Sequence, residues 1–253
     1  MFADRRIKLV LQYDGSGFFG WQLQRRERTV QGVLEDLLQR LCGTRLRVIA
    51  AGRTDRGVHA TGQVAGLRVP RKWDADRLRR ALNALAPPDL WVASAEEVPL
   101  AFHPRYDAIA RTYLYRLGVA EEAHSPFRRP WCWPLGRPLD LDRVMEATAA
   151  LRGTHSFAAF AKAGPPERGD RCTVRSAEWR AAPLDPGILL EFEITADRFL
   201  HHMVRCLVGT LAGIGLGQRP AGDVTRLLSG APGLRAARPA PAQGLFLTHV
   251  DYP

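Results

Sequence analysis

Segments with the alternation of a strand and segments with the periodicity of a helix follow one another in a repeated order along this chain. In the first half the order is strand, helix, strand, strand, helix, strand. The predicted elements of that half cover residues 8–13, 29–43, 46–50, 63–69, 74–85 and 90–98. This order is that of a ferredoxin-like unit, in which helices pack on one face of an antiparallel sheet.

The second half repeats the order with longer elements and an extra short helix. Its predicted elements cover residues 108–119, 140–151, 171–182, 187–195, 199–216, 222–228 and 244–250. We therefore expect an α+β protein made of two ferredoxin-like βαββαβ halves, residues 1–104 and 105–253. The halves are expected to join into a mixed, largely antiparallel sheet with helices on one face and a central active-site cleft. A bare sheet face of this kind often binds RNA.

The charge of the chain points to a polyanionic partner. The formal net charge is +10, and all but Lys8, Lys72 and Lys162 of the 36 basic residues are arginines, which suit phosphates and stack on bases. A codon bias toward Arg, Ala, Gly and Pro would give a similar composition. No run of about 18 apolar residues predicts a membrane helix, and the start of the chain has no signal-peptide pattern, so we expect a cytoplasmic location.

The spacing of the four cysteines does not indicate a disulfide framework. Cys42, Cys132, Cys172 and Cys206 lie far apart, with no CxxC pair. Isolated reduced thiols in a cytosolic protein are expected, and a zinc site is not.

One acidic residue stands out in the loop between the second and third predicted strands. Asp55 lies between Arg53 and Arg56 in the stretch IAAGRTDRGVHATGQVA, whose glycines allow a tight turn. Neighbouring guanidinium groups favour the ionised carboxylate, which can act as a nucleophile or a base but not as a general acid. A solvated turn aspartate is the alternative that the loop alone leaves open.

Five separated segments together give a resemblance to a known family. They are YDGSGFFGWQLQ (13–24), GRTDRGVHATGQVA (52–65), FHPRYDAIARTYLYRL (102–117), FLHHMVRCLVG (199–209) and GLFLTHVDYP (244–253). In this order they resemble the A family of tRNA pseudouridine synthases, which modify uridines 38 to 40 in the anticodon arm. The resemblance spans nearly the whole chain. That family usually has Ala where Arg56 stands here.

The resemblance implies roles for particular residues. Asp55 corresponds to the nucleophile that attacks the uridine, at the ribose C1′ or the ring C6. Tyr113 corresponds to the phenol that stacks on the flipped base, and strand alternation places it on one face with Arg111 and Tyr115. Arg205 corresponds to the cation that pairs with the catalytic carboxylate.

The remaining implied roles concern RNA binding. Arg53 corresponds to the arginine that enters the RNA stem and helps to eject the base, and Arg56, His59, Arg111 and Phe199 are assigned to substrate binding. The resemblance implies tRNA as partner and a homodimer that one tRNA crosses. It implies no cofactor and no metal, because the isomerisation has no net redox change.

Other functions remain open from the residues themselves. A non-catalytic RNA-binding module could have the same sheet face, although a buried anion such as Asp55 would repel phosphate. A glycosidase that releases the base would need two flanking carboxylates, and no motif places a second acid. The pair His201–His202 is more typical of a polar helix edge than of a metal site, since no third ligand is evident.

Overall fold

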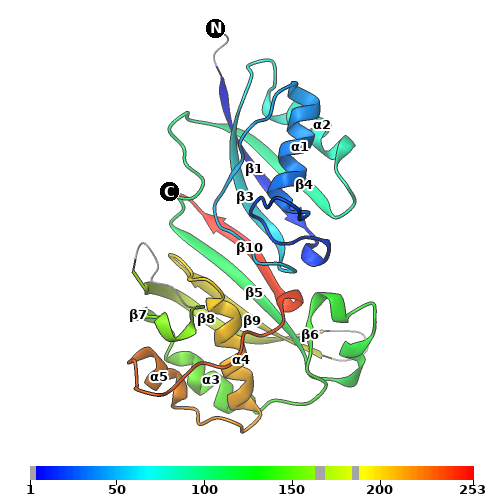
Figure 1. Ribbon diagram of the computed structural model, residues 1–253. Helices are drawn as coiled ribbons and strands as arrows, with labels where there is room; N and C mark the ends of the chain where they lie inside the picture. The colour runs from blue at the N-terminus through cyan, green and yellow to red at the C-terminus, as the bar shows by residue number, and fades with distance from the viewer. Residues whose placement is uncertain (1–3, 163–168, 184–187) are drawn as a thin grey trace. The chain divides into compact units, whose positions relative to one another are not determined.

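The computed structural model describes residues 4–162, 169–183 and 188–253 (Figure 1). The chain divides into two compact units. Unit 1 comprises Met1–Ile109 together with Phe246–Pro253, and unit 2 comprises Ala110–Leu245. The division at residues 104 and 105 remains a prediction, and the structure differs from it at the end of the chain, which groups with unit 1. No helix within the described ranges has the length and apolar character needed to cross a membrane.

Unit 1 is an antiparallel sheet extended by one parallel strand. Its elements are β1 (Arg5–Tyr13), η1 (Gly15–Gly17), α1 (Val30–Cys42), β2 (Ile49–Ala50), β3 (His59–Val69), α2 (Ala75–Leu85), β4 (Leu90–Val98) and β10 (Leu245–Asp251). Strand order is β4-β1-β3-β10, with β2 also paired to β3. β1 runs antiparallel to β3 and β4, whereas β3 runs parallel to β10.

The alternation in β1 directs one set of side chains into the core of unit 1. Ile7, Leu9 and Leu11 are fully buried, and α1 and α2 lie on one side of this sheet (Figure 1). The predicted ends of α1 are confirmed. The Thr29 hydroxyl accepts a hydrogen bond from the Gly32 amide, and Gly43 ends the helix in the left-handed conformation.

The last strand, β10, pairs in parallel with β3 of unit 1, a pairing that the sequence did not predict. Gly62 explains the close approach, because a Cβ at this position would lie 2.0 Å from the Thr248 carbonyl oxygen. The rings of His59 and Phe246 stack beside this contact, 4.7 Å apart.

The strands of unit 2 are also mainly antiparallel, and this unit has helices of its own. Its elements are β5 (Ala110–Gly118), η2 (Glu121–His124), η3 (Arg129–Trp131), β6 (Trp133–Pro134), α3 (Leu141–Ala149), β7 (Gly153–Ser156), η4 (Ala158–Phe160), β8 (Arg171–Pro183), β9 (Ile188–Ala196), α4 (Met203–Gly215), α5 (Asp223–Leu228) and η5 (Ala242–Gly244). The order is β5-β9-β8-β7, and β6 adds a short parallel pairing to β5. The α+β class with mixed, mainly antiparallel strands is thus confirmed.

Unit 2 contains two features that the sequence did not predict. The short strands β6 and β7 have too few residues for a readable alternation. Helix α4 begins at Met203 rather than at residue 199, because His202 at its N-cap has a φ of 65°. The predicted start of the second hairpin strand at residue 187 lies outside the described residues.

Candidate active-site elements

Asp55 lies on a short loop, residues 51–58, between β2 and β3. We call this segment the Asp loop. The Thr54 carbonyl accepts a hydrogen bond from the Trp21 amide at 3.0 Å, and the Val58 amide donates to the Asp55 carbonyl at 3.1 Å. Gly57 completes that turn with a φ of 77°, which favours glycine. The backbone on both sides of Asp55 is therefore fixed.

A buried polar network anchors the Asp loop to the sheet of unit 1. The Tyr13 hydroxyl lies 2.8 Å from the Thr54 hydroxyl, and the Gln63 amide donates to the Gly52 carbonyl at 2.8 Å. Gln63 also contacts the Tyr13 hydroxyl at 3.4 Å. Burial raises the pKa of Tyr13 to about 12, so this phenol stays neutral near pH 7. Because these groups are buried, each hydrogen bond in the network constrains the loop.

The two arginines beside Asp55 differ from the sequence-based expectation. Asp55 is half-buried, whereas Arg53 and Arg56 are exposed. The Arg56 guanidinium lies over the Phe19 ring, 4.0 Å from its centroid. Within the described part of the chain, neither arginine forms an ion pair. Both cations are therefore available to a ligand outside the loop.

His59, at the start of β3, is almost fully buried at 1% exposure. Its Nδ1 accepts a hydrogen bond from the Gly15 amide at 3.0 Å and lies 3.2 Å from an Asp14 carboxylate oxygen. Since the Gly15 amide needs a lone pair on Nδ1, this contact favours the tautomer with its proton on Nε2. His59 therefore ties η1 to the start of β3.

In unit 2, Tyr113 and Phe199 come together. The register of β5 with β9 is unbroken from Arg111 to Gly118, so Arg111, Tyr113 and Tyr115 share one face as the alternation predicts. The Tyr113 ring is 9% exposed and meets the Phe199 ring edge to face at 5.0 Å. These two rings form an aromatic corner at the start of the strand.

Arg111, the third residue of that face, is tied to the end of β9. Its guanidinium donates to the Asp197 carbonyl at 2.9 Å, while the Asp197 carboxylate accepts from the Thr173 amide at 2.8 Å. Arg111 therefore fixes the turn after β9 and presents a cation beside the aromatic corner.

Arg205 lies in the first turn of α4. Its Nε donates to the Ala240 carbonyl at 2.7 Å, and the Ala240 amide donates back to the Arg205 carbonyl at 2.9 Å. Burial raises the pKa of the Tyr115 phenol well above its usual value, and the Arg205 charge partly opposes this shift. A cation in a first helical turn adds to the positive end of the helix dipole. The surroundings of Arg205 therefore favour an anion.

The start of α4 is strained at a histidine. Among the described residues, His202 is the one non-glycine with positive φ, and its ring lies 4.1 Å from that of His201. The His201 carbonyl accepts a hydrogen bond from the Lys162 amide. Strain of this kind persists only where surrounding contacts require it, and here it sets the direction of the helix that carries Arg205.

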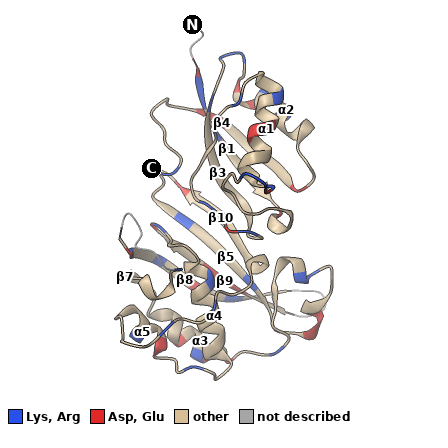
Figure 2. Cartoon of the chain, in the orientation of Figure 1, with Lys and Arg blue, Asp and Glu red and all other residues tan. Residues whose placement is uncertain are grey.

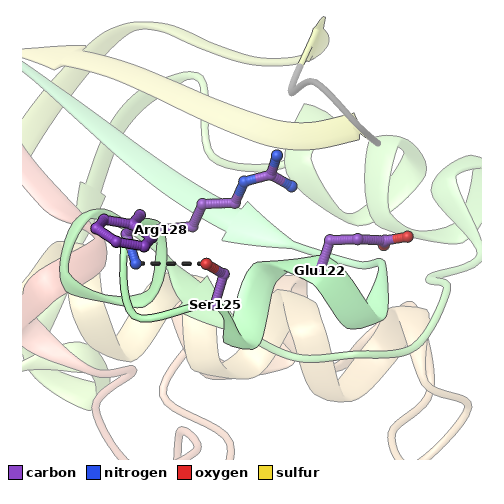
Figure 3. Close-up of a pocket in the computed structure, with 4 residues that line it drawn as sticks. Glu122, Ser125 and Arg128 are labelled. Carbon is purple, nitrogen blue, oxygen red and sulfur yellow. Dashed lines mark hydrogen bonds between the residues drawn. The ribbon is translucent and has the colours of Figure 1, made fainter.

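One open pocket lies away from the residues described above. It has a volume of about 360 Å³ and is lined by Glu122, Ser125, Phe127 and Arg128 in the segment after β5 (Figure 3). The Phe127 amide contacts the Ser125 hydroxyl at 3.4 Å, and the Phe127 ring is 86% exposed. None of the predicted site residues lines this pocket.

The sequence did not predict the residues that anchor the Asp loop. Tyr13, Thr54 and Gln63 lie within the quoted motifs, but nothing in the strand pattern indicates that their polar atoms meet. The available signal was a polar side chain at a position that strand alternation buries, as with Gln63 in β3, which is fully buried.

Comparison with known proteins shows that this chain is similar to one family over most of its length. Residues 9–107 and 147–253 match the family described as tRNA pseudouridine synthase. A protein named tRNA pseudouridine synthase A from Geobacter sp. (strain M21) is 39% identical over 253 residues, covering 98% of this chain and 99% of that protein. One of the same name from Myxococcus xanthus is 40% identical over 247 residues, covering 98% and 92%.

Solved structures give only a weak similarity. An archaeal box H/ACA sRNP Nop10–Cbf5 complex matches 81% of this chain and 44% of that chain, at 10% identity and a TM-score of 0.36. Similarity at that level carries no functional information. Asp55 and Arg205 fall within the two family-matched ranges, whereas Tyr113 falls between them.

Proposed function

Because this chain belongs to the tRNA pseudouridine synthase family, we propose that it converts uridine to pseudouridine at positions 38, 39 and 40 of the tRNA anticodon stem-loop, with Asp55 as nucleophile. The observation that carries the proposal is a half-buried carboxylate on a loop whose backbone and neighbours are fixed by buried hydrogen bonds. A solvated turn aspartate would need no such anchoring.

The reaction balances without any external reagent. The Asp55 carboxylate adds to the uridine, at C1′ or C6, and the bond between N1 and C1′ breaks. The base turns, a bond forms between C5 and C1′, the proton on C5 is lost and N1 gains a proton. The carboxylate is regenerated and the mass of the RNA is unchanged. Since no oxidant, reductant or metal takes part in this sequence, we expect activity to survive EDTA.

Tyr113 and Phe199 are proposed to receive the flipped base. Their rings meet at an angle of 81°, which leaves the face of one ring available for stacking while the other supports it. The Tyr113 phenol is then the group that assists removal of the proton from C5. Arg111 beside them is assigned to a substrate phosphate.

Arg205 is proposed to pair with the Asp55 carboxylate. Its Nε is held by the Ala240 carbonyl, and its place in the first turn of α4, at the positive end of the helix, favours an anionic partner. Such a pair would keep the nucleophile ionised and oriented inside a desolvated site.

The exposed arginines of the Asp loop are assigned to RNA. Arg53 is proposed to fill the gap that the extruded base leaves, which offsets part of the cost of unstacking. Arg56, already oriented by Phe19, is proposed to bind a neighbouring phosphate. The positive net charge fits a long RNA footprint, and we propose that a homodimer in the cytoplasm shares one tRNA.

The decisive experiment measures tritium release from tRNA labelled at C5 of uridine. Wild-type protein is expected to release the label and to leave a mass-neutral modification in the anticodon arm. Asp55→Asn, which keeps the size of the side chain, is expected to reduce release at least 1000-fold, because the amide cannot act as nucleophile. Its tRNA affinity is expected to stay within a few fold.

Two outcomes would contradict the proposal. Full activity of Asp55→Asn would remove the nucleophile, and tRNA binding by wild type without any tritium release would indicate a non-catalytic RNA-binding module. Free uracil among the products would indicate hydrolysis rather than isomerisation. Arg226→Gln, a change of an exposed side chain on helix α5 (Asp223–Leu228), is the matched control and is expected to behave as wild type.

A further inference from the structure

Two arginines lie opposite each other where β1 begins and β3 ends. Arg6 on β1 and Arg68 on β3 are direct partners in the antiparallel register, so their side chains lie on the same face of the sheet. Directly opposed residues have Cβ atoms about 4.5–5.5 Å apart, and like charges in such positions repel each other. This face is opposite to the one that buries Ile7 and Leu9.

Arg6 is buried without a partner of its own. It is 8% exposed, and its Nε is buried with no hydrogen-bond acceptor. Arg68, by contrast, is exposed. The pair therefore combines one shielded cation with one that solvent, or a ligand, can reach.

The neighbouring carboxylates already have partners. On β4, Glu97 pairs with Arg5 at 2.5 Å and Glu96 pairs with Lys8. Among residues 4–162, 169–183 and 188–253, no carboxylate forms an ion pair with Arg6 or Arg68. The positive charge of the Arg6–Arg68 pair is therefore uncompensated within the described part of the protein.

The pKa of Arg6 is consistent with a buried cation that has a second cation beside it. Burial, and then the charge of Arg68, lower the pKa of Arg6 below its usual value. A shielded guanidinium beside a second cation is unfavourable unless an anion is present. A bound oxyanion would supply the missing acceptor and relieve the repulsion between the two cations.

We propose that Arg6 and Arg68 form a binding site for a phosphate group. A phosphate has several acceptor oxygens, so it can bridge two guanidinium groups by charge-assisted hydrogen bonds. Lys and Arg residues occur along both units (Figure 2), but this pair differs from ion-paired arginines such as Arg28, which is held by Asp89.

A phosphodiester of the bound RNA is the first source to consider. Tyr13, which contacts the Asp loop, is seven residues from Arg6 along β1, or about 23 Å at the rise of a strand. A phosphate at the Arg6–Arg68 pair would thus belong to a part of the RNA distant from the target nucleotide. This assignment rests on the proposed function, whereas the phosphate site itself does not.

The first test uses sulfate as a phosphate analogue and thermal unfolding as readout. Wild type and Arg68→Gln are compared in about 50 mM sodium sulfate and about 150 mM sodium chloride, which have equal ionic strength. Sulfate stabilises most proteins in general, so the result is the difference between the two proteins. Sulfate is expected to raise the Tm of wild type by several degrees more than that of Arg68→Gln. The control Arg226→Gln is expected to respond as wild type.

The second test measures tRNA affinity against salt concentration. For Arg68→Gln the slope of log K against log salt is expected to fall by about 1, with unchanged turnover at saturating tRNA. Arg68→Glu can pair with Arg6, so it is expected to lose the sulfate response, to bind tRNA more weakly still and to remain folded. Arg226→Gln is expected to keep the wild-type slope.

The results of the two tests together distinguish an RNA phosphate from a free oxyanion as the ligand of the Arg6–Arg68 pair. A sulfate response together with the loss of slope supports an RNA phosphate, and a sulfate response with an unchanged slope supports a free oxyanion at the same site. Equal sulfate responses in wild type and Arg68→Gln, with equal slopes, would overturn the site. Lack of tritium release by wild type would overturn the proposed function and leave the sulfate result standing.

Discussion

The Asp loop of unit 1 and the Tyr113–Arg205 elements of unit 2 hold their side chains by different means. Asp55 is on irregular backbone, and its position depends on a buried polar network formed by Tyr13, Thr54 and Gln63. Tyr113 is on a strand in unbroken register and Arg205 on a helix. The comparison teaches that the position of Asp55 depends on a few specific hydrogen bonds, whereas the positions of Tyr113 and Arg205 depend on regular secondary structure.

Among the variants that test this comparison of the two units, Gly20→Ala is expected to have the largest effect on stability and activity. Gly20 has a φ of 88°, and a Cβ there would lie 2.6 Å from the Thr54 carbonyl oxygen, so the Asp loop must shift. We expect a loss of about 2–4 kcal/mol in the free energy of unfolding and an activity decrease of about 100-fold. Urea unfolding and tritium release measure the two effects.

Gly43→Ala is the matched control for this change. Gly43 has a similar φ of 76°, but a Cβ there meets nothing within 4 Å. We expect a cost of about 1 kcal/mol and unchanged activity, because only backbone strain is added. Equal activity losses in the two variants would show that the Asp loop is not specially sensitive.

The next effect concerns high pH. Burial raises the pKa of Tyr13 from 10 to about 12 in the folded protein, so the folded state binds this proton more tightly than the unfolded state. The stabilisation is fully present below pH 10 and is lost as the pH rises through 12, a change of about 3 kcal/mol. Urea unfolding at about pH 9 and about pH 11.5 should show a smaller decline for Tyr13→Phe than for wild type. Identical declines would contradict the assignment.

Tyr13→Phe at neutral pH tests the network itself. The change removes the hydroxyl that lies 2.8 Å from the Thr54 hydroxyl and leaves buried polar atoms unpaired. We expect a loss of about 1–2 kcal/mol in the free energy of unfolding and roughly tenfold lower turnover, because Thr54 precedes Asp55, the proposed nucleophile. Turnover equal to that of wild type would mean that the loop is positioned by its backbone alone.

The smallest effect is expected for Tyr115→Phe in unit 2. Its hydroxyl donates to the Pro241 carbonyl at 2.8 Å, so its removal should cost about 1 kcal/mol. Turnover should stay within about twofold, since the strand register rather than this hydroxyl positions Tyr113. A large activity loss in Tyr115→Phe would show that specific hydrogen bonds matter in unit 2 as much as in unit 1, and would contradict the comparison.

Much of the secondary structure could be predicted from local sequence. Helix α1 begins after Thr29 and ends before Gly43 because a side-chain cap and a left-handed glycine act over a few residues. Strands β1 and β4 followed from alternation alone. The sequence did not predict features that depend on contacts between distant residues. One is the pairing of β10 with β3, which depends on the close approach of Gly62 and Thr248.

The same division applies to the candidate site. The motifs singled out Asp55, Tyr113 and Arg205, but they did not predict that Arg56 stacks on Phe19 or that His59 is buried against η1. Neither motif nor pattern indicated the Arg6–Arg68 pair, because the two residues are 62 positions apart in sequence and only the register of the strands opposes them.

The sequence by itself determined the order of strands and helices, the family and the candidate nucleophile, since caps, periodicities and motifs act through neighbouring residues. Only the tertiary structure decided that the last strand pairs with β3, which hydrogen bonds hold the Asp loop and which cations lack a counter-charge. These depend on burial and on contacts between distant residues, which no local pattern contains.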